Sequence, residues 1–296
     1  MAQQEQGNDD ERTRQLERLV LQLCPGLEDF PLVSPVASIS LEKRVDELLE
    51  DASFSDDFAW TTSLHPRWVA EQMNQGFLPT AEMLCGQFFI GLPKLHVHRS
   101  VLRWENFHIE KNARKRSKKL QMSVNKSFDE VMVELLRTHG EHTTWLQPPL
   151  NEAFRVLSRA AGSGEYCAQV ISIEVWDSDG KLVAGEIGYV VRRVYCSLSG
   201  FCHLTGAGTV QMCCLGKMLQ RRGCAFWDLG MHLPYKGKLG AVRLPRAEFV
   251  TALRQSGSGL EVSLEGRVPC SELLSDKDDD APTGPLPAKI PKLAEQ

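Results

Sequence analysis

The chain has 296 residues, of which 42% are hydrophobic and 24% are charged, so it is long enough to bury a substantial core. Its formal net charge of -4 at pH 7 excludes a global positive field, so binding to nucleic acid or to acidic membranes would have to come from a local patch. No apolar run approaches the roughly 18 to 20 residues that span a bilayer, and the opening residues lack the apolar segment of a signal peptide. Nine irregularly spaced cysteines argue against a secreted disulfide framework, so we expect a cytoplasmic protein that does not bind membranes.

Two short helices are predicted near the N-terminus. The first ten residues are polar, and we expect them to be disordered. In residues 11–23 the apolar side chains recur at helical spacing, which predicts an amphipathic helix. A second helix should begin after Ser40, whose hydroxyl is suited to cap it, and should end in the acidic stretch ELLEDASFSDD.

The stretch ISIEVWDSDGKLVAGEIGYVVRRVYCSLSGF, residues 171–201, predicts three consecutive β-strands. Apolar and polar residues alternate from Ile171 to Val175, and Asp179-Gly180 is a favoured hairpin turn. A second strand over residues 182–191 and a third over residues 193–198 should follow the first.

Helices and one further strand surround this meander in the sequence. Glycines bound a predicted helix over residues 209–222, and CAFWDL, residues 224–229, predicts a buried strand after it. Two more helices are expected upstream, over residues 128–138 and 149–161. The order of these elements predicts an α+β fold with a mostly antiparallel sheet flanked by helices.

The composition divides the chain into three parts. We expect a partly disordered acidic extension with short helices over residues 1–53 and a globular body over residues 54–266. Residues 267–296, rich in acids and prolines, should form a disordered tail.

Five stretches carry a resemblance to a known family. They are TSLHPRWVAEQMNQGFLP (62–79), TWL (144–146), SIEVWDSDGKLVAGEIGYVVRRVYCS (172–197), FWDL (226–229) and KLGAVRLPRAEF (238–249). In order and spacing they resemble the leucyl/phenylalanyl-tRNA-protein transferases over most of residues 58–253. This resemblance implies a small N-terminal domain, over residues 54–103, followed by a main C-terminal domain, over residues 104–266, similar to the GNAT acetyltransferase fold.

The resemblance also implies an activity. The family transfers Leu, Phe or Met from a charged tRNA to the N-terminal Arg or Lys of a protein, within the N-degron pathway. The implied partners are therefore an aminoacyl-tRNA and a protein with a free N-terminus, and the implied state is a monomer. Such a reaction needs an aminoacyl pocket, a route for the proton of the amine and hydrogen-bond donors for the oxyanion. It needs no cofactor, because the ester is already activated.

Two positions depart from the family pattern. The family carries Asp-x-Gln at the end of a strand, and Asp228 matches the Asp, so we expect Asp228 to be catalytic. The position of the Gln is taken by Gly230, which has no side chain. The family's Gly-Glu-Ser-Met-Phe-Ser corresponds to residues 197–202, in which Leu198 replaces the Glu and cannot accept a proton.

The resemblance places the substrate pocket at Trp145, Ser197, Ser199 and Phe201. Strand alternation predicts that Ser197 and Ser199 project to the face opposite Leu198. Structural roles remain open as alternatives. The hydroxyls then simply end a strand, the aromatic rings pack in a core, and Asp228 is a hydrogen-bonded structural acid.

A strongly basic segment, EKNARKRSKKL, stands at residues 110–120 of this otherwise acidic chain. Phosphates are the natural partners of such a cluster, and the family uses basic residues here on the tRNA acceptor stem. A solvated face or a nuclear-import signal is the alternative. The predicted tRNA-binding residues are Lys111, Arg114, Lys115, Arg116, Lys118 and Lys119.

The changes at Leu198 and Gly230 leave three functions open. The first is an aminoacyl-tRNA-protein transferase with an altered acceptor preference, and the second is a tRNA- or N-terminus-binding homologue without catalysis. The third is an acyl-CoA-dependent N-acyltransferase. No metal site is expected, because the pairs His96 with His98 and His139 with His142 lack an obvious third ligand.

Overall fold

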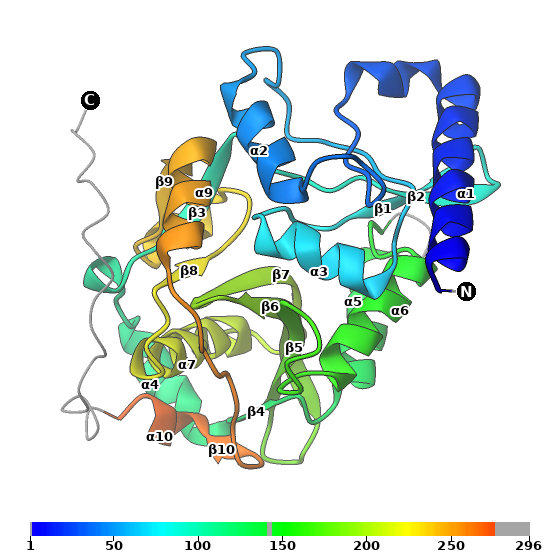
Figure 1. The fold of residues 1–296 in the computed structure, drawn as a ribbon. Coiled ribbons are helices and arrows are strands. Elements are labelled where there is room, and N and C mark those ends of the chain that lie inside the picture. Colours follow the sequence, from blue (N-terminus) through cyan, green and yellow to red (C-terminus); the bar gives the residue numbers. More distant parts are fainter. Residues whose placement is uncertain (1, 141–143, 276–296) are drawn as a thin grey trace.

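A mixed sheet of eight strands forms the centre of the molecule (Figure 1). The computed structural model describes residues 2–140 and 144–275. The strand order is β10-β4-β5-β6-β7-β8-β3-β9, and neighbouring strands are antiparallel except for β7 and β8, which are parallel. The strands of this sheet are β3 (His98–Leu102), β4 (Gln121–Val124), β5 (Ala168–Trp176), β6 (Leu182–Val191), β7 (Val194–Cys202), β8 (Phe226–Asp228), β9 (Val242–Pro245) and β10 (Val268–Pro269).

The predicted hairpin joins β5 to β6. Asp177 accepts hydrogen bonds through Oδ1 from the backbone amides of Asp179 and Lys181, at 3.0 and 2.9 Å. Gly180 has a φ of +79°, a left-handed conformation that glycine adopts without strain. The short local bonds of this turn fix the pairing of two long strands, and the prediction of a three-stranded meander is confirmed.

Helices cover both faces of the sheet. Residues of α2, α3, α5, α6 and α9 belong to one buried apolar cluster, and residues of α4, α7 and α10 belong to a second cluster on the other face. Every residue of β6 is buried, because this strand lies between the two clusters. These helices and this sheet confirm the predicted α+β class, while the similarity to the GNAT fold stays a prediction. The α-helices are α1 (Ala2–Leu23), α2 (Leu41–Glu50), α3 (Pro66–Asn74), α4 (Lys111–Arg116), α5 (Phe128–His139), α6 (Pro148–Arg159), α7 (Ala207–Arg221), α8 (Pro234–Lys238), α9 (Arg246–Gln255) and α10 (Cys270–Leu273).

The N-terminal part of the chain adds a small two-stranded sheet and short 3-10 turns. The strands β1 (Ala81–Leu84) and β2 (Phe88–Gly91) are antiparallel. Val20 of α1, Trp60 and Ile90 of β2 form a third apolar cluster that holds α1 against this hairpin. The helix α1 begins at Ala2, well before residue 11, where the sequence predicted its start. The 3-10 turns are η1 (Pro25–Asp29), η2 (Trp104–Asn106) and η3 (Ser117–Lys119).

Three elements of the central sheet and its helical cover lie outside the predicted bounds of the main domain. The strand β3 precedes residue 104 but pairs with β8 and β9 of the central sheet. The strand β10 and helix α10 follow residue 266, and β10 pairs with β4 while Cys270 is fully buried. Residues 276–296 of the predicted tail lie outside the described residues, and the boundaries themselves remain predictions. No helix within residues 2–140 and 144–275 is both long and apolar enough to cross a membrane.

The predicted cap of α2 is present, because the Ser40 hydroxyl accepts a hydrogen bond from the Lys43 amide at 3.2 Å. We expect Ser40→Ala to lower the free energy of unfolding by about 1 kcal/mol, since the replacement leaves this amide without its capping acceptor. Urea unfolding of the variant measures the loss. Ser38→Ala is the matched control, because Ser38 is also exposed and precedes the helix without capping it. Equal stability of the two variants would contradict the assigned cap.

Candidate functional site

A cleft of about 580 Å³ opens where β7 extends beyond its neighbour β8. The strand β8 pairs with β7 only over Val194–Cys196. Within the described part of the chain no strand pairs with residues 197–202 on that side, so the sheet is open there. The walls of the cleft come from β6, residues 197–202 of β7, the first half of α7, and α8. Hereafter this cavity is called the cleft.

Three of the four predicted pocket residues lie in the cleft, namely Ser197, Ser199 and Phe201. Leu198, at the position of the family's Glu, lies there as well and also packs against the apolar core. Trp145 is not among the cleft residues, and its ring packs edge-on against Phe154 of α6 with the centroids 6.3 Å apart. The structure therefore brings together the part of the predicted pocket that β7 supplies.

The prediction that Ser197 and Ser199 share one face is wrong. Ile187 pairs with Ser199 while Gly188 pairs with Ser197, so Leu198 is the extra residue of a β-bulge. Ser197 consequently points to the α7 face, where its Oγ lies 2.8 Å from Glu186 Oε1. Ser199 points to the other face, where its Oγ lies 3.0 Å from Nε2 of His139 at the end of α5. The two serines therefore contact different walls of the cleft.

Glu186 of β6 is a cleft residue that the sequence analysis did not single out. Its Oε1 accepts hydrogen bonds from the Tyr195 hydroxyl at 2.7 Å and the Ser197 hydroxyl at 2.8 Å, and its Oε2 accepts one from Gln211 at 2.9 Å. Burial raises the pKa of Glu186 above its ordinary value, although these three hydrogen bonds act in the opposite direction. The available signal was a carboxylate inside the strand LVAGEIGYVV, whose other residues carry no charge. A buried charge is costly unless it is paired or hydrogen-bonded, so such a residue points to polar partners from other elements.

Lys236 of α8 closes another side of the cleft. Its ammonium donates hydrogen bonds to the carbonyl oxygens of Leu229 and Met231, and the side chain is only 8% exposed. Burial lowers the pKa of Lys236, while the negative charges of Asp228 and Glu186 act in the opposite direction. The contacts of Lys236 hold α8 against the chain that leaves β8.

Asp228 is not one of the residues that line the cleft, although the next residue, Leu229, is. It is 1% exposed, its Oδ1 accepts a hydrogen bond from the Gly230 amide at 2.8 Å, and its Oδ2 lies 3.5 Å from Arg99 Nε. Burial would lower the pKa of Arg99, but the charge of Asp228 contributes to raising it above the ordinary value. These contacts fit a residue that positions the turn after β8. The catalytic role predicted for Asp228 stays a prediction.

The backbone accounts for the glycine at position 230. Gly230 has a φ of +68°, in the left-handed region that L side chains rarely adopt. A Cβ atom there would meet only ordinary contacts, at 3.4 Å from Leu78 Cδ1 and 3.8 Å from the Ser197 carbonyl oxygen. The conformation of the chain, rather than lack of space, therefore favours glycine at this position.

Within the basic segment, residues 111–119 form α4 and η3 beside the cleft. Ala113 and Ser117 are buried and attach the segment to the core, whereas all six predicted tRNA-binding side chains are exposed. Glu110, which precedes α4, lines the cleft. A second cavity of about 520 Å³ lies between this segment and the start of α7, and it is lined by Lys115, Arg116, Lys119, Gly206 and Ala207 among others.

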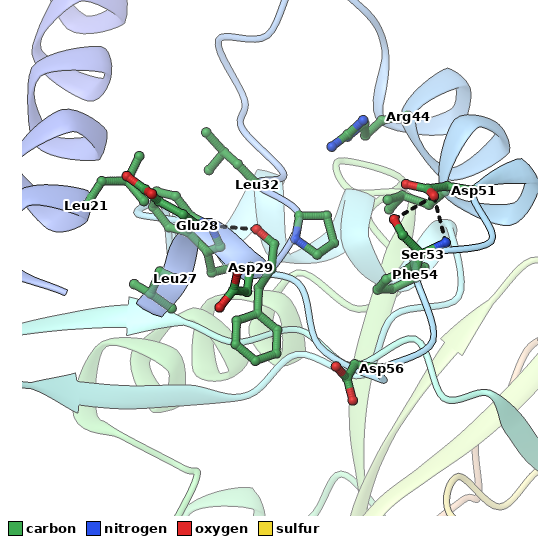
Figure 2. Close-up of a pocket in the computed structure, with 14 residues that line it drawn as sticks. Leu21, Leu27, Glu28, Asp29, Leu32, Arg44, Asp51, Ser53, Phe54 and Asp56 are labelled. Carbon is green, nitrogen blue, oxygen red and sulfur yellow. Dashed lines mark hydrogen bonds between the residues drawn. The ribbon is translucent and has the colours of Figure 1, made fainter. Parts of the chain in front are cut away.

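A third cavity, of about 440 Å³, lies in the N-terminal part of the molecule (Figure 2). Glu28, Asp29, Asp51 and Asp56 line it together with Arg44. It shares no lining residue with the cleft. No group of three or more potential metal ligands gathers among residues 2–140 and 144–275, and His142 lies outside them.

The part of the chain that forms the cleft matches a known protein family. The model of the leucyl/phenylalanyl-tRNA protein transferase family matches residues 101–254, which include the basic segment and all residues that line the cleft. The leucyl/phenylalanyl-tRNA–protein transferase of Pseudoalteromonas atlantica is 33% identical over 161 residues, which are 53% of this chain and 65% of that protein.

Two further proteins of the same name are similar. That of Aeromonas hydrophila is 30% identical over 160 residues, covering 53% of this chain and 65% of that protein. That of Ralstonia pickettii is 27% identical over 168 residues, covering 54% of this chain and 64% of that protein. The chain thus spans slightly less than two thirds of the length of these relatives.

Proposed function

Because the chain belongs to the leucyl/phenylalanyl-tRNA protein transferase family, we propose that it transfers an amino acid from a charged tRNA to the free N-terminus of a protein. The observation that carries this proposal is the position of the cleft directly beside the basic segment. Glu110 lines the cleft and also precedes α4, which carries the first of the exposed cations. A tRNA backbone held by these cations would therefore present its aminoacylated end at the cleft.

The proposed reaction is an aminolysis of an ester. The nitrogen of the neutral α-amine attacks the carbonyl carbon, so a C–N bond forms and the C–O bond to the terminal ribose breaks. The amine loses a proton, and the ribose hydroxyl leaves with one. The chain has to exclude water, hold the two substrates together and let this proton pass, and the activated ester supplies the driving force without a cofactor.

Named residues have different parts in this proposal. Ser197, Ser199 and Phe201 line the pocket for the aminoacyl group, since they lie in the cleft. Asp228 is a positioning residue that fixes the Leu229–Gly230 turn, because it contacts the Gly230 amide and Arg99 rather than the cavity. Trp145 lies outside the cleft and packs against Phe154 and the apolar core. We further propose that the protein acts as a monomer in the cytoplasm, where charged tRNA is available.

We expect the protein to attach a labelled amino acid to a peptide with a free N-terminus when mixed tRNA, charged with labelled amino acids, is supplied. Ser199→Trp should lower this transfer about tenfold or more, because the indole would occupy the cleft. Mass spectrometry of the peptide measures the product and its attachment site. Ser163→Trp is the matched control, because Ser163 is exposed in a loop outside the cleft and its replacement should leave transfer unchanged.

An N-acetylated peptide should receive no label. If no peptide with a free N-terminus is labelled while charged tRNA still binds, the transferase proposal fails. The second candidate, a binding protein without catalysis, would then hold. It is favoured by Leu198, which lies in the cleft and has no group that accepts a proton.

A further inference from the structure

Glu186 places a carboxylate inside a cavity of substrate size, and the proposed transfer does not use it. The side chain is 6% exposed, yet it lines the cleft of about 580 Å³. It comes from the middle of β6, a strand that is otherwise buried and carries no other charge. A residue that lines the cleft and is so deeply buried would contact the part of a substrate that enters the cleft furthest.

The hydrogen bonds of Glu186 leave capacity on one oxygen. Oε1 accepts from two hydroxyls, those of Tyr195 and Ser197. In the described part of the chain, Oε2 accepts from one donor, the Gln211 side chain. A carboxylate offers about four lone-pair sites, two on each oxygen, so Oε2 retains an acceptor site. The polar neighbours orient the carboxylate without occupying all of its acceptor sites.

An apolar substrate side chain is a poor match for this wall. Packing a leucyl or phenylalanyl group against Glu186 would remove the remaining water from the carboxylate and give no hydrogen bond in return. A guanidinium or ammonium group would donate a charge-assisted hydrogen bond and offset the charge. The poor fit of an apolar side chain and the good fit of a cationic one both concern the same acceptor atom, Oε2 of Glu186.

The positive groups of the protein itself do not replace such a ligand. Lys236 also lines the cleft and its charge acts on Glu186, but its ammonium donates hydrogen bonds to the carbonyl oxygens of Leu229 and Met231 and none to the carboxylate. Lys238 lines the cleft from an exposed position on α8, and Glu110 adds a second negative charge. Within the described residues, no Lys or Arg side chain forms an ion pair with Glu186.

We propose that Glu186 selects a transferred amino acid whose side chain carries a positive charge, of the lysyl or arginyl class. This inference rests on the proposed transferase function. Glu186 accepts a hydrogen bond from Ser197, which belongs to the predicted pocket for the aminoacyl group, so its carboxylate faces the transferred amino acid. A cationic first residue of the acceptor is already implied by the resemblance to the family.

The first experiment measures binding without turnover. The probes are 3′-aminoacylamino-3′-deoxyadenosines that carry lysine, arginine, glutamine, leucine or phenylalanine, whose amide link is not an activated ester. Calorimetry should give at least tenfold tighter binding of the lysyl and arginyl probes than of the leucyl probe. Glu186→Gln should weaken the two cationic probes by about ten- to a hundredfold and leave the leucyl probe within about twofold.

Two further variants separate charge from folding. Glu186→Met, which replaces the carboxylate by an apolar chain of similar length, should reverse the preference in favour of leucine and phenylalanine. Glu130→Gln is the matched control, because Glu130 is exposed on α5 and lies outside the cleft, and it should change nothing. If Glu186→Gln does not fold, the preference of the wild-type protein among the five probes still decides.

The second experiment separates the transferred amino acid from the acceptor through transfer rates. One series varies the amino acid on tRNA with a fixed acceptor peptide, and the other varies the first residue of the peptide with a fixed aminoacyl-tRNA. A preference for Lys or Arg in the first series that is lost in Glu186→Gln supports the proposal. A cationic preference confined to the acceptor series, or tighter binding of the leucyl probe than of the lysyl and arginyl probes by the wild-type protein, would overturn it. Absence of all transfer alongside tight lysyl-probe binding would instead overturn only the proposed reaction.

Discussion

Asp228→Ala is expected to lower the free energy of unfolding by about 3–5 kcal/mol, because it leaves the Arg99 guanidinium buried without its counter-charge. Both side chains are 1% exposed, and Arg99 also stacks over the Phe249 ring at 4.4 Å. Removal of Asp228 therefore strands a positive charge inside the apolar core. Urea unfolding followed by circular dichroism measures the loss.

A surface pair of the same chemistry provides the control. Arg155 Nε and Asp129 Oδ1 lie 2.7 Å apart, but Asp129 is 67% exposed. Asp129→Ala should change the free energy of unfolding by no more than about 1 kcal/mol, since water already solvates both groups. The double variant Arg99→Met with Asp228→Ala should lose less than the sum of the single losses, because no charge is left unpaired. A loss from Asp228→Ala as small as that from Asp129→Ala would refute the assigned ion pair.

This stability effect bears on any test of catalysis at Asp228. A variant that unfolds loses transfer whether or not the carboxylate handles a proton. Transfer rates of Asp228→Ala therefore have to be expressed per folded molecule, at a temperature and denaturant concentration where the variant is native. A rate that stays normal on that basis shows that Asp228 serves the stability of the fold alone, and a lower rate shows that transfer depends on its carboxylate.

Loss of four cations from the basic segment is expected to weaken tRNA binding strongly and to flatten its dependence on salt. The logarithm of the binding constant falls linearly with the logarithm of the salt concentration. Each phosphate that is no longer neutralised should make this negative slope shallower by about 0.7 to 0.9. The variant should therefore bind far more weakly at low salt and differ less from wild type at high salt. Fluorescence anisotropy of labelled tRNA across a salt series measures both quantities. The replacement is Lys115, Arg116, Lys118 and Lys119 to Ala.

A variant with the same change in net charge tests whether the position of the charges matters. It removes four exposed cations from other surfaces and should keep the salt slope of the wild-type protein. If both variants lose affinity equally, the segment acts only through the net charge of the chain, and its role as the tRNA-binding surface fails. The control replaces Arg18, Lys43, Lys126 and Arg159 by Ala.

Local patterns in the sequence predicted the elements well. The turn at Gly180 and the cap at Ser40 depend on contacts within four residues, so the sequence contains all that fixes them. The same holds for α5, α6 and α7, whose apolar spacing and flanking residues predicted their positions to within about two residues. The alternation over residues 171–175 and the turn at Gly180 predicted β5 and β6 for the same reason.

The candidate site was predicted only in part, because its geometry depends on contacts between distant segments. One extra residue in β7, Leu198, moves Ser199 to the other face, and the bulge is visible only in the pairing with β6. The partner of Asp228 is Arg99 of β3, which no spacing within the sequence identifies. Glu186 likewise became a candidate only when β6 and β7 were found to border the open edge beyond β8.

The complete burial of β6 has a consequence for the wall of the cleft that carries Glu186. Amide hydrogens of a strand that is covered on both faces are expected to exchange with solvent mainly through global unfolding. Short α8, by contrast, is five residues long and can open locally at a smaller free-energy cost. Entry to the cleft and the selection proposed for Glu186 would therefore depend on two segments with different local stabilities, so a mutation in α8 could alter the rate of entry without altering the preferred substrate.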